Sequence, residues 1–341
     1  MQMCMMMSTG RRVKASGSRC SRRRSLLLIL VLGALFSSAY PSISGSDRAS
    51  LIFISDTQDP LWFERIILAE NNNIAASALI MERIVAEKPA AVFHLGDLVA
   101  LGFSESSWGR IDSFLIHLKR NQIPFYPTLG NHELLFRPDR GAEQFMRRFP
   151  EYSPTGYMIR VDHIAVLMMN SNFGYPESGQ IEQQQRWYRQ TLDYCEQDTS
   201  VYCVIVAAHH SPYTNSKVVS SDEDVQTYLV PDFLESPKTV LFLSGHAHAF
   251  EHFYRSGKDF MVIGGGGGLQ QPLATGAAAE FDDLYTGPEK RPFHFLKVTR
   301  SATKIDLAVY MVNADQSGFE IGYRTVLPFH RPHQWEQVNA E

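Results

Sequence analysis

Three observations predict that this chain adopts an α/β fold. Short apolar strands alternate with amphipathic helices between residues 51 and 244. The strands are near-continuous apolar runs, which is typical of strands buried on both faces by flanking layers. Beyond Phe293 the alternation gives way to strands alone, joined by turns. The end of the chain is therefore expected to complete a sheet.

The N-terminal segment, residues 1–39, differs in composition from the rest of the chain. It carries seven basic residues and no acidic one, followed by an apolar run from Leu26 to Phe36 and small residues at Ser37 and Ala39. A basic region, an apolar core too short to span a bilayer and a small-residue cleavage site predict an export signal. The stretch Arg23 to Leu27 also resembles a twin-arginine pattern, so Sec export, twin-arginine export and an uncleaved anchor remain open.

The chain is therefore expected to have three parts: a signal peptide at 1–39, one folded domain at 47–328 and a polar tail at 329–341. We expect an exported protein, periplasmic or secreted, with no stable membrane partner once the signal is removed. The Met-rich opening leaves the true start undecided.

The charge of the mature chain limits its partners. Removing the seven basic residues of the signal takes the formal net charge from −4 to −11. An acidic body disfavours binding to a phosphate backbone, which needs clustered Lys and Arg. No nucleic-acid partner is expected, and a nuclease is disfavoured.

Two cysteines, Cys195 and Cys203, remain in the mature chain. In an oxidising compartment they could form a disulfide between a helix end and the next strand. Two independent buried thiols are the alternative, and the sequence leaves both open.

The elements follow in order from local patterns. Asn73 is a candidate N-cap for a helix that runs to about Glu87, where Pro89 ends it. Its inward face is predicted to be Ile74, Ala78, Met81 and Val85. A second helix, 107–120, turns Ile111, Phe114, Leu115 and Leu118 inward. Further helices are expected at 180–192 and 225–233. Strands are expected at 51–54, 90–95, 125–128, 163–170, 201–208, 239–244, 293–299, 304–312 and 319–327.

Polar residues, some of them preceded by a glycine, follow five of these strands directly. They are Asp56 and Gln58, then Gly96 and Asp97, then Gly130, Asn131, His132 and Glu133, then His209 and His210, and finally Gly245, His246 and His248. Because the carboxyl ends of strands in an open α/β sheet share one edge, these side chains are expected to converge on one crevice.

Carboxylate, amide and imidazole groups without a thiolate suit metals such as Mn, Fe, Co, Ni or Zn. The candidates outnumber the ligands of one tetrahedral site, so the residues favour two metal ions. The glycine run 264–268 lacks the Lys and Ser or Thr of a nucleotide-binding loop, and a tight turn is the favoured interpretation.

The blocks "DTQ", "GDLV", "GNHE", "HHSP" and "GHAH", in that order, resemble the signature of the calcineurin-like metallophosphoesterases. This superfamily includes purple acid phosphatases and cyclic-nucleotide phosphodiesterases. The resemblance covers about Leu51 to Gly268. It implies a four-layer αββα sandwich of two mixed sheets between helical layers.

The resemblance also implies roles for individual residues. Asp97 would bridge two metal ions. The first ion would be completed by Asp56, Gln58 and His248, and the second by Asn131, His210 and His246. His210 is preferred to His209 as the ligand, because the family's histidine usually lies two residues before a proline, here Pro212. His209 would then support or pack against the ligands.

Two departures from the family pattern bear on the metals. Gln58 stands where the family usually has His, and an amide oxygen is a weaker ligand for Zn than an imidazole is. The first site is expected to favour a harder ion such as Mn or Mg, or to be incomplete. Ala100 stands where purple acid phosphatases have the Tyr that binds ferric iron, which disfavours that chemistry. Mn, Fe, Zn, Co and Mg therefore remain open.

The resemblance implies hydrolysis of a small-molecule phosphoester. Two metals would lower the pKa of bound water so that a hydroxide attacks phosphorus, with His132 as the general acid and Glu133 orienting its imidazole. Phosphomonoesters are favoured over diesters as substrates. The alternative is a non-catalytic binding scaffold of the same fold with an incomplete first metal site. The oligomeric state is not predicted.

Overall fold

The computed structural model describes residues 41–43, 49–69, 71–175 and 178–329. The predicted signal peptide and almost all of the predicted tail lie outside these ranges. Within them, no helix combines the length and the apolar character needed to cross a bilayer.

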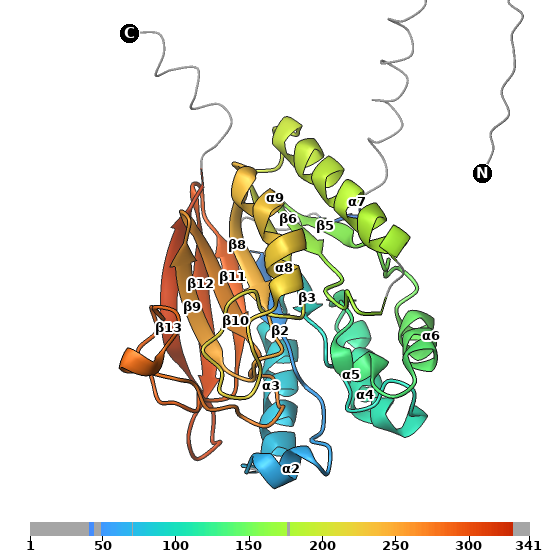
Figure 1. The fold of residues 1–341 in the computed structure, drawn as a ribbon, viewed down its shortest axis with the longest axis vertical. Coiled ribbons are helices and arrows are strands. Elements are labelled where there is room, and N and C mark those ends of the chain that lie inside the picture. Colours follow the sequence, from blue (N-terminus) through green and yellow to red (C-terminus); the bar gives the residue numbers. More distant parts are fainter. Residues whose placement is uncertain (1–40, 44–48, 70, 176–177, 330–341) are drawn as a thin grey trace, which may run out of the picture. The chain divides into compact units, whose positions relative to one another are not determined.

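Three parallel strands that precede candidate site residues belong to a six-stranded mixed sheet (Figure 1). Its strand order is β13-β12-β11-β2-β3-β4. Its strands are β2 (Ser50–Ile54), β3 (Ala91–His94), β4 (Phe125–Pro127), β11 (His294–Arg300), β12 (Lys304–Val312) and β13 (Phe319–Pro328). The strand-only end of the chain thus pairs antiparallel to β2, through β11, as the sequence indicated.

The second sheet has seven strands in the order β1-β5-β6-β7-β8-β10-β9 and is also mixed. Its strands are β1 (Ser42–Ile43), β5 (Tyr157–Val161), β6 (Ile164–Met168), β7 (Cys203–Ala207), β8 (Thr239–Ser244), β9 (Phe250–Arg255) and β10 (Lys258–Ile263). The strands β6, β7, β8 and β10 run parallel to one another. Their carboxyl ends therefore lie at one edge of this sheet.

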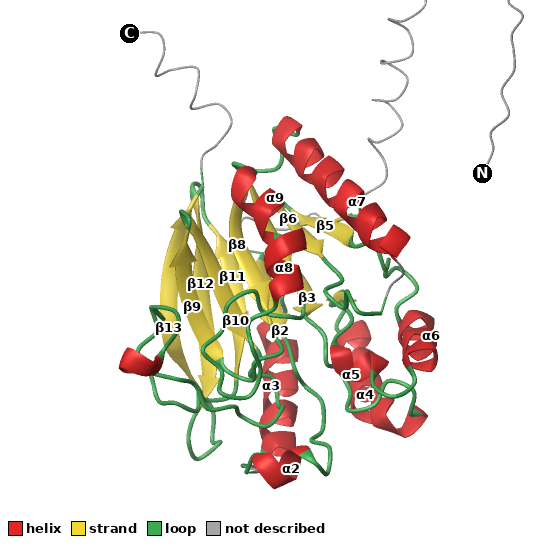
Figure 2. Ribbon diagram, viewed as in Figure 1, coloured by secondary structure: helices red, strands yellow, loops and turns green. Residues whose placement is uncertain are grey.

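The helices of the described residues are α2 (Glu64–Ile67), α3 (Asn73–Glu87), η1 (Glu105–Trp108), α4 (Gly109–Arg120), α5 (Asn131–Leu134), α6 (Pro138–Arg148), α7 (Ser178–Gln197), α8 (Glu223–Tyr228), α9 (Val230–Glu235) and η2 (Gly276–Ala278). The longer ones cover the outer faces of the sheets, as Figure 2 shows. Two sheets between helical layers confirm the predicted four-layer αββα sandwich.

The central core lies between the two sheets. It joins residues of the six-stranded sheet, such as Phe53 and Leu307, to residues of the seven-stranded sheet, such as Ile205 and Leu243, and all four are fully buried. An apolar surface buried on this scale is the main favourable term in folding. It also fixes the position of one sheet against the other, which the site described below requires.

A second core lies between the six-stranded sheet and helices α3, α4 and α6. In α4, Ile111, Phe114 and Leu118 are buried, which confirms the predicted face of that helix. On the other sheet, Phe233 of α9 packs edge-on against Phe242 of β8 at a centroid distance of 5.5 Å.

The predicted inward face of α3 is correct for Met81, which is buried, and for Val85, which packs against the second core, but it is wrong for Ile74 and Ala78, which are exposed. Ile74 is 53% exposed, whereas Ile80, Ile84 and the polar Asn73 are buried. The helix is rotated because the Asn73 amide donates to the carbonyls of the glycine run, at 3.2 Å to Gly267 and 3.0 Å to Gly268. A tertiary hydrogen-bond pair thus fixes the orientation that the apolar spacing left ambiguous.

One further expectation is corrected, and one alternative that the sequence left open is decided. The single helix predicted at 225–233 is two short helices, α8 and α9, because Pro231 falls at the start of the second one. Cys195 and Cys203 are both buried free thiols, not a disulfide. Each has its own apolar surroundings, and burial raises the pKa of each thiol to about 12.

Candidate metal centre

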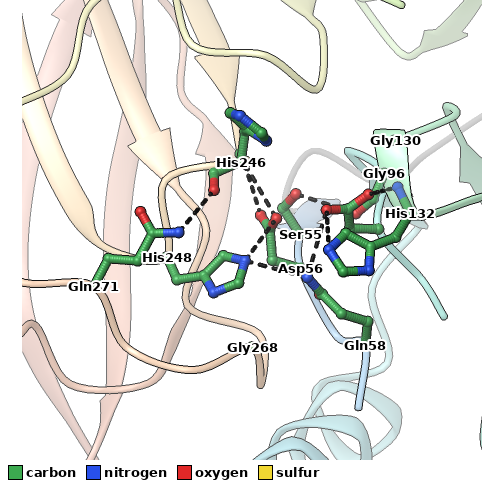
Figure 3. Close-up of polar contacts among 12 residues, drawn as sticks. Ser55, Asp56, Gln58, Gly96, Gly130, His132, His246, His248, Gly268 and Gln271 are labelled. Atoms are coloured by element: carbon green, nitrogen blue, oxygen red, sulfur yellow. Dashed lines mark hydrogen bonds and ion pairs between the residues drawn. The ribbon is translucent and has the colours of Figure 1, made fainter. Parts of the chain in front are cut away.

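The polar residues that follow the strands do converge, but they come from two sheets and not from one. The loops after β2, β3 and β4 of the six-stranded sheet meet the loops after β7 and β8 of the seven-stranded sheet. Figure 3 shows Asp56 and Gln58 facing His246 and His248 across this junction. Two groups of potential metal ligands result: Asp56, Asp97 and His248, and His209, His210 and His246.

Asp97 lies at the centre of the cluster. Its Oδ2 is 3.3 Å from Nε2 of His209, and its Oδ1 accepts the backbone N–H of His132 at 2.8 Å. Burial alone would raise the pKa of Asp97, but the imidazoles of His209 and His132 outweigh burial and hold that pKa well below its usual range. A buried carboxylate kept ionised among imidazoles is suited to bind cations.

Asp56 makes the second carboxylate contact between the sheets. Its Oδ1 is 3.5 Å from Nε2 of His248, and its two oxygens accept the backbone N–H of His246 at 3.1 and 3.0 Å. His248 is oriented from behind, because its Nδ1 donates to the carbonyl of Leu269 at 2.8 Å. That leaves Nε2 as the atom facing the cluster, as in histidine ligands held by an outer hydrogen bond.

Gln58 is brought into the same cluster. Its Nε2 lies 3.4 Å from Oδ2 of Asp97 and 3.2 Å from Nε2 of His248. Its Oε1 is buried and finds no donor among the described residues. A buried amide oxygen without a donor is normally satisfied by some partner, and a cation would provide one.

His209 and His210 occupy different positions in the cluster. His209 is fully buried, and its Nε2 is 3.0 Å from Oδ1 of Asn131 as well as close to Asp97. His210 is partly buried, and its Nδ1 is 2.9 Å from the hydroxyl of Ser171. Both side chains thus reach the cluster that the sequence predicted for one of them.

The protonation states of these histidines differ. Burial opposes the charged form of His209, but Asp97 outweighs burial and raises the pKa of His209 to about 9. Burial, with the neighbouring His209, lowers the pKa of His210 to about 3. Burial, together with the neighbouring His210 and His209, lowers the pKa of His246 well below its usual value. His210 and His246 are therefore neutral, which is the form that binds metals.

The side chains of His132 and Glu133 have different partners, although the two residues are adjacent in the sequence. The Glu133 carboxylate accepts the backbone N–H groups of Asp97, Leu98, Val99 and Gly130 at 2.8 to 3.1 Å. It thereby joins the loop after β3 to the loop after β4. These contacts give Glu133 an architectural role that the sequence did not predict.

The imidazole of His132 is held by other groups. Its Nδ1 donates to the carbonyl of Ala100 at 3.1 Å. Its Nε2 faces Oε1 of Glu64 at 3.7 Å and Oδ2 of Asp97 at 3.9 Å. Glu64, on the short helix α2, was not predicted, because the segment around this four-residue helix has no recognisable sequence pattern.

Three of the predicted ligands have strained backbones. Asp56, Asp97 and His246 have φ angles of 58°, 56° and 66°, which only a small fraction of non-glycine residues adopt. Residues held in this region cluster at functional sites, where the surrounding structure imposes the conformation. The strain sits at three of the loops that bring the two sheets' side chains together.

The glycine run that follows β10 packs beneath the ligands. Gly266 and Gly268 donate backbone N–H groups to the carbonyls of Ser55 at 2.9 Å and Asp56 at 2.8 Å. A Cβ on Gly268 would lie 2.5 Å from the ring of His248. The run is thus more than the predicted tight turn, since its missing side chains let the loop press against Asp56 and His248.

Two other supporting residues were not predicted as such. His94 is buried at the end of β3 and contacts the hydroxyl of Thr57 at 3.0 Å, next to Asp56. Ser171, at the end of β6, accepts the backbone N–H groups of His209 and His210 at 3.2 and 2.9 Å. Ser171 follows a strand directly, so its position was a usable signal, whereas His94 inside a strand gave none.

The residues present fit a bound metal. Carboxylate, amide and imidazole atoms face one another in a buried cluster, and the ligand atoms of each group of three lie within 4.8 Å of one another. The unpartnered amide oxygen of Gln58 and the neutral state of His210 and His246 agree with this fit.

Two sheets between helical layers, with such a cluster at the carboxyl ends of their strands, are the arrangement that the family resemblance implied. The chain belongs to the calcineurin-like phosphoesterase family, whose sequence model matches residues 49–250. This confirms the family resemblance of the signature blocks.

The chain is similar over part of its length to a curated protein of onion, Allium cepa, described as phosphoenolpyruvate phosphatase. The two are 25% identical over 189 residues, which is 51% of this chain and 38% of the onion protein. The chain therefore corresponds to well under half of that relative.

Solved structures share the fold at low sequence identity. The Plasmodium protein GAP50, described as the anchor in the inner membrane complex, gives a TM-score of 0.63 at 15% identity, covering 86% of this chain and 92% of that one. The purple acid phosphatase PPD1 of yellow lupin gives 0.55 at 16% identity, covering 85% and 55%. A dimetal phosphatase of Danio rerio gives 0.50 at 13%, covering 83% and 99%.

Proposed function

We propose that this protein is an exported hydrolase of phosphoesters that uses two divalent metal ions and prefers phosphomonoesters. One observation carries the proposal: two groups of three ligand-type side chains, one around Asp97 and one around His246, face each other in one buried cluster. The family match and the phosphatases among its relatives support it.

The residues divide the work as follows. Asp97 would contact both ions, with Asp56, Gln58 and His248 on one side and Asn131, His210 and His246 on the other. Bound there, two divalent ions would lower the pKa of water and neutralise charge on the phosphoryl oxygens.

His132 would give a proton to the leaving oxygen. Its Nδ1–H is tied to the carbonyl of Ala100, so Nε2 is the atom free to exchange a proton with substrate. Glu64 and Asp97 both face that nitrogen, at 3.7 and 3.9 Å.

Export is proposed from the sequence of residues 1–39, whose basic and apolar regions have the order of a signal peptide. We expect the purified mature protein to begin near residue 40, and N-terminal sequencing of the exported form tests this.

A non-catalytic scaffold is the second candidate. Two observations favour it: Gln58 replaces the family's usual histidine, and one structural relative is described as an anchor. The intact carboxylates and His132 oppose it, because a scaffold has no need for an ionised Asp97 beside a proton donor.

The test is hydrolysis of a chromogenic phosphomonoester and phosphodiester by the mature protein, stripped of metal and resupplied with Mn, Zn, Fe, Co or Mg. We expect metal-dependent turnover, faster on the monoester. Asp97→Asn should lower kcat/KM on the order of a thousand-fold, as losing a principal electrostatic group does. Asp193→Asn, exposed on α7, is the matched control and should change nothing.

Metal analysis of the same samples separates the two candidates. Two bound equivalents with turnover support the hydrolase. At most one equivalent with no turnover of either ester would replace it with the scaffold.

A further inference from the structure

A pocket of about 350 Å³ opens beside the candidate metal centre. Asn131 and His210, two of the predicted ligands of the second metal ion, line it. Loops after β4, β6 and β7 and the start of α8 build its walls. Its other lining residues include Phe136, Phe173, Tyr175, Asp222 and Asp224.

The position of this pocket suits the leaving group of a substrate. A phosphate held by Asn131 and His210 through metal ions would have its ester substituent at the pocket mouth. This step rests on the proposed function. The chemistry of the walls then decides which substituent is accepted.

Three aromatic rings contribute to the walls. Phe136 is 69% exposed and Tyr175 is 38% exposed, while Phe173 is nearly buried against Tyr228 at a centroid distance of 5.0 Å. Tyr175 is fixed by its hydroxyl, which donates to Asp139 at 3.0 Å. Exposed aromatic faces attract cations through the ring quadrupole.

Two carboxylates complete the lining, and it contains no Lys or Arg. Asp222 caps α8 by accepting the backbone N–H of Val225 at 2.7 Å, and Asp224 is exposed in the first turn of the same helix. Across the described part of the chain, neither acid forms an ion pair with Lys or Arg. No Lys or Arg of the described residues neutralises either acid, although the Asp222 carboxylate also accepts the N–H of its helix.

We propose that this pocket selects phosphomonoesters whose leaving group carries a positive charge, such as the phosphate ester of an alkylammonium alcohol. The aromatic rings and the two carboxylates would both attract the ammonium group. The same carboxylates repel a leaving group that bears a carboxylate. Phosphoenolpyruvate, the compound named for the onion relative, is thus expected to be a poor substrate here.

The test compares esters that differ in charge at similar shape. The metal-loaded mature protein is given choline phosphate, neohexyl phosphate as its uncharged carbon isostere, and phosphoenolpyruvate. We expect kcat/KM for choline phosphate to exceed that for the neohexyl ester by about five-fold or more, which is the effect of one nearby opposite charge in a wet site. Phosphoenolpyruvate should be the slowest of the three.

Variants of α8 assign the preference to the pocket. Asp224→Asn and Asp222→Asn should each move the ratio of the choline to the neohexyl ester towards one, and Asn retains the helix cap at 222. Glu223→Gln is the matched control, because Glu223 is exposed on the same turn but does not line the pocket. Its ratio should equal that of the wild type.

Binding of the free alcohols separates this inference from the proposed function. Choline and neohexyl alcohol are titrated calorimetrically into the metal-loaded protein and into Asp224→Asn. An Asp224-dependent preference for choline in a protein that hydrolyses no ester supports the pocket and overturns the hydrolase. An active enzyme with equal kcat/KM for both esters, in wild type and variants, overturns the pocket inference alone.

Discussion

The two sheets contribute chemically different halves to the candidate metal centre. The six-stranded sheet supplies the candidate oxygen ligands, from Asp56, Gln58, Asp97 and Asn131. The seven-stranded sheet supplies the candidate nitrogen ligands, from His210, His246 and His248, with His209 beside them. The group of Asp56, Asp97 and His248 draws its members from both sheets, whereas the group of His209, His210 and His246 comes from the seven-stranded sheet and obtains its counter-charge from Asp97 of the other sheet. The comparison teaches that the site is a property of the packing between the sheets.

Each half is also held together by its own buried glutamate. In the oxygen half, Glu133 joins the loops of Asp97 and Asn131 through four backbone N–H groups. In the nitrogen half, Glu251 of β9 accepts the hydroxyl of Thr214 at 2.6 Å and the N–H of Asn215 at 2.8 Å. Burial raises the pKa of each carboxyl to about 7. Glu251 thus anchors the loop that follows His210.

The largest expected effect distinguishes two residues within the nitrogen half. His210→Ala should remove one metal site and lower the bound equivalents from two to one. His209→Ala should keep both sites and weaken binding about 10- to 100-fold, as the loss of an outer partner of metal ligands does. Metal stoichiometry and titration of both variants measure this. The reverse pattern would make His209 the ligand and His210 its support.

The next effect concerns the glutamate of the nitrogen half. The folded pKa of Glu251, about 7, lies above its ordinary 4.5 because burial disfavours the charge, although Thr214 and Asn215 oppose this. The contribution of Glu251 to the free energy of unfolding is therefore fully present below pH 4.5, and it is lost as the pH rises through 7. Glu251→Gln cannot titrate, so its free energy of unfolding relative to wild type should rise by about 3 kcal/mol across that window.

Urea unfolding of both proteins at acidic and mildly alkaline pH measures this change. Asp283 and Arg291 also lie close enough to influence Glu251, and both remain in the variant. Glu320→Gln, exposed on β13, is the control and should show a constant difference from wild type. A constant difference for Glu251→Gln as well would mean that Glu251 titrates normally.

The smallest effect is expected from a substitution that gives the oxygen half an imidazole of its own. Gln58→His places an imidazole beside Asp97 and His248, where the amide now lies. Zinc affinity should rise on the order of ten-fold, while magnesium affinity should not, because imidazole suits zinc. Competitive metal titration checks this. Gln190→His, exposed on α7, controls for an added histidine elsewhere, and an unchanged zinc affinity in Gln58→His would exclude Gln58 from the metal shell.

Much of the site could be predicted because its residues follow strands directly. Apolar runs ending in Asp56, Asp97 or His246 gave both the strand and the position of the polar side chain at its end. Glu133 and Glu64 were harder, since nothing local shows that a glutamate will accept backbone amides or face an imidazole from another loop. Such contacts depend on segments distant in the sequence.

The helix faces show the same limit. The face of α4 was predicted because Ile111, Phe114, Leu115 and Leu118 recur at helical spacing, and Ile116 is the one apolar residue of the helix outside that face. The face of α3 was predicted only in part, because apolar residues occur around most of its circumference and two hydrogen bonds from Asn73 decide the rotation. Periodicity fixes a helix but leaves its orientation to its neighbours when the apolar stripe is broad.

The sequence by itself determined the α/β architecture, the strand ends and the family, because apolar runs, glycines and ligand-type residues are local patterns. Only the tertiary structure decided that the site lies between two sheets, that His209 is buried against Asp97, and that Glu133 holds loops and not the imidazole of His132. The physical reason is that burial and hydrogen bonding at the site depend on how two separately formed sheets pack, which local sequence does not encode.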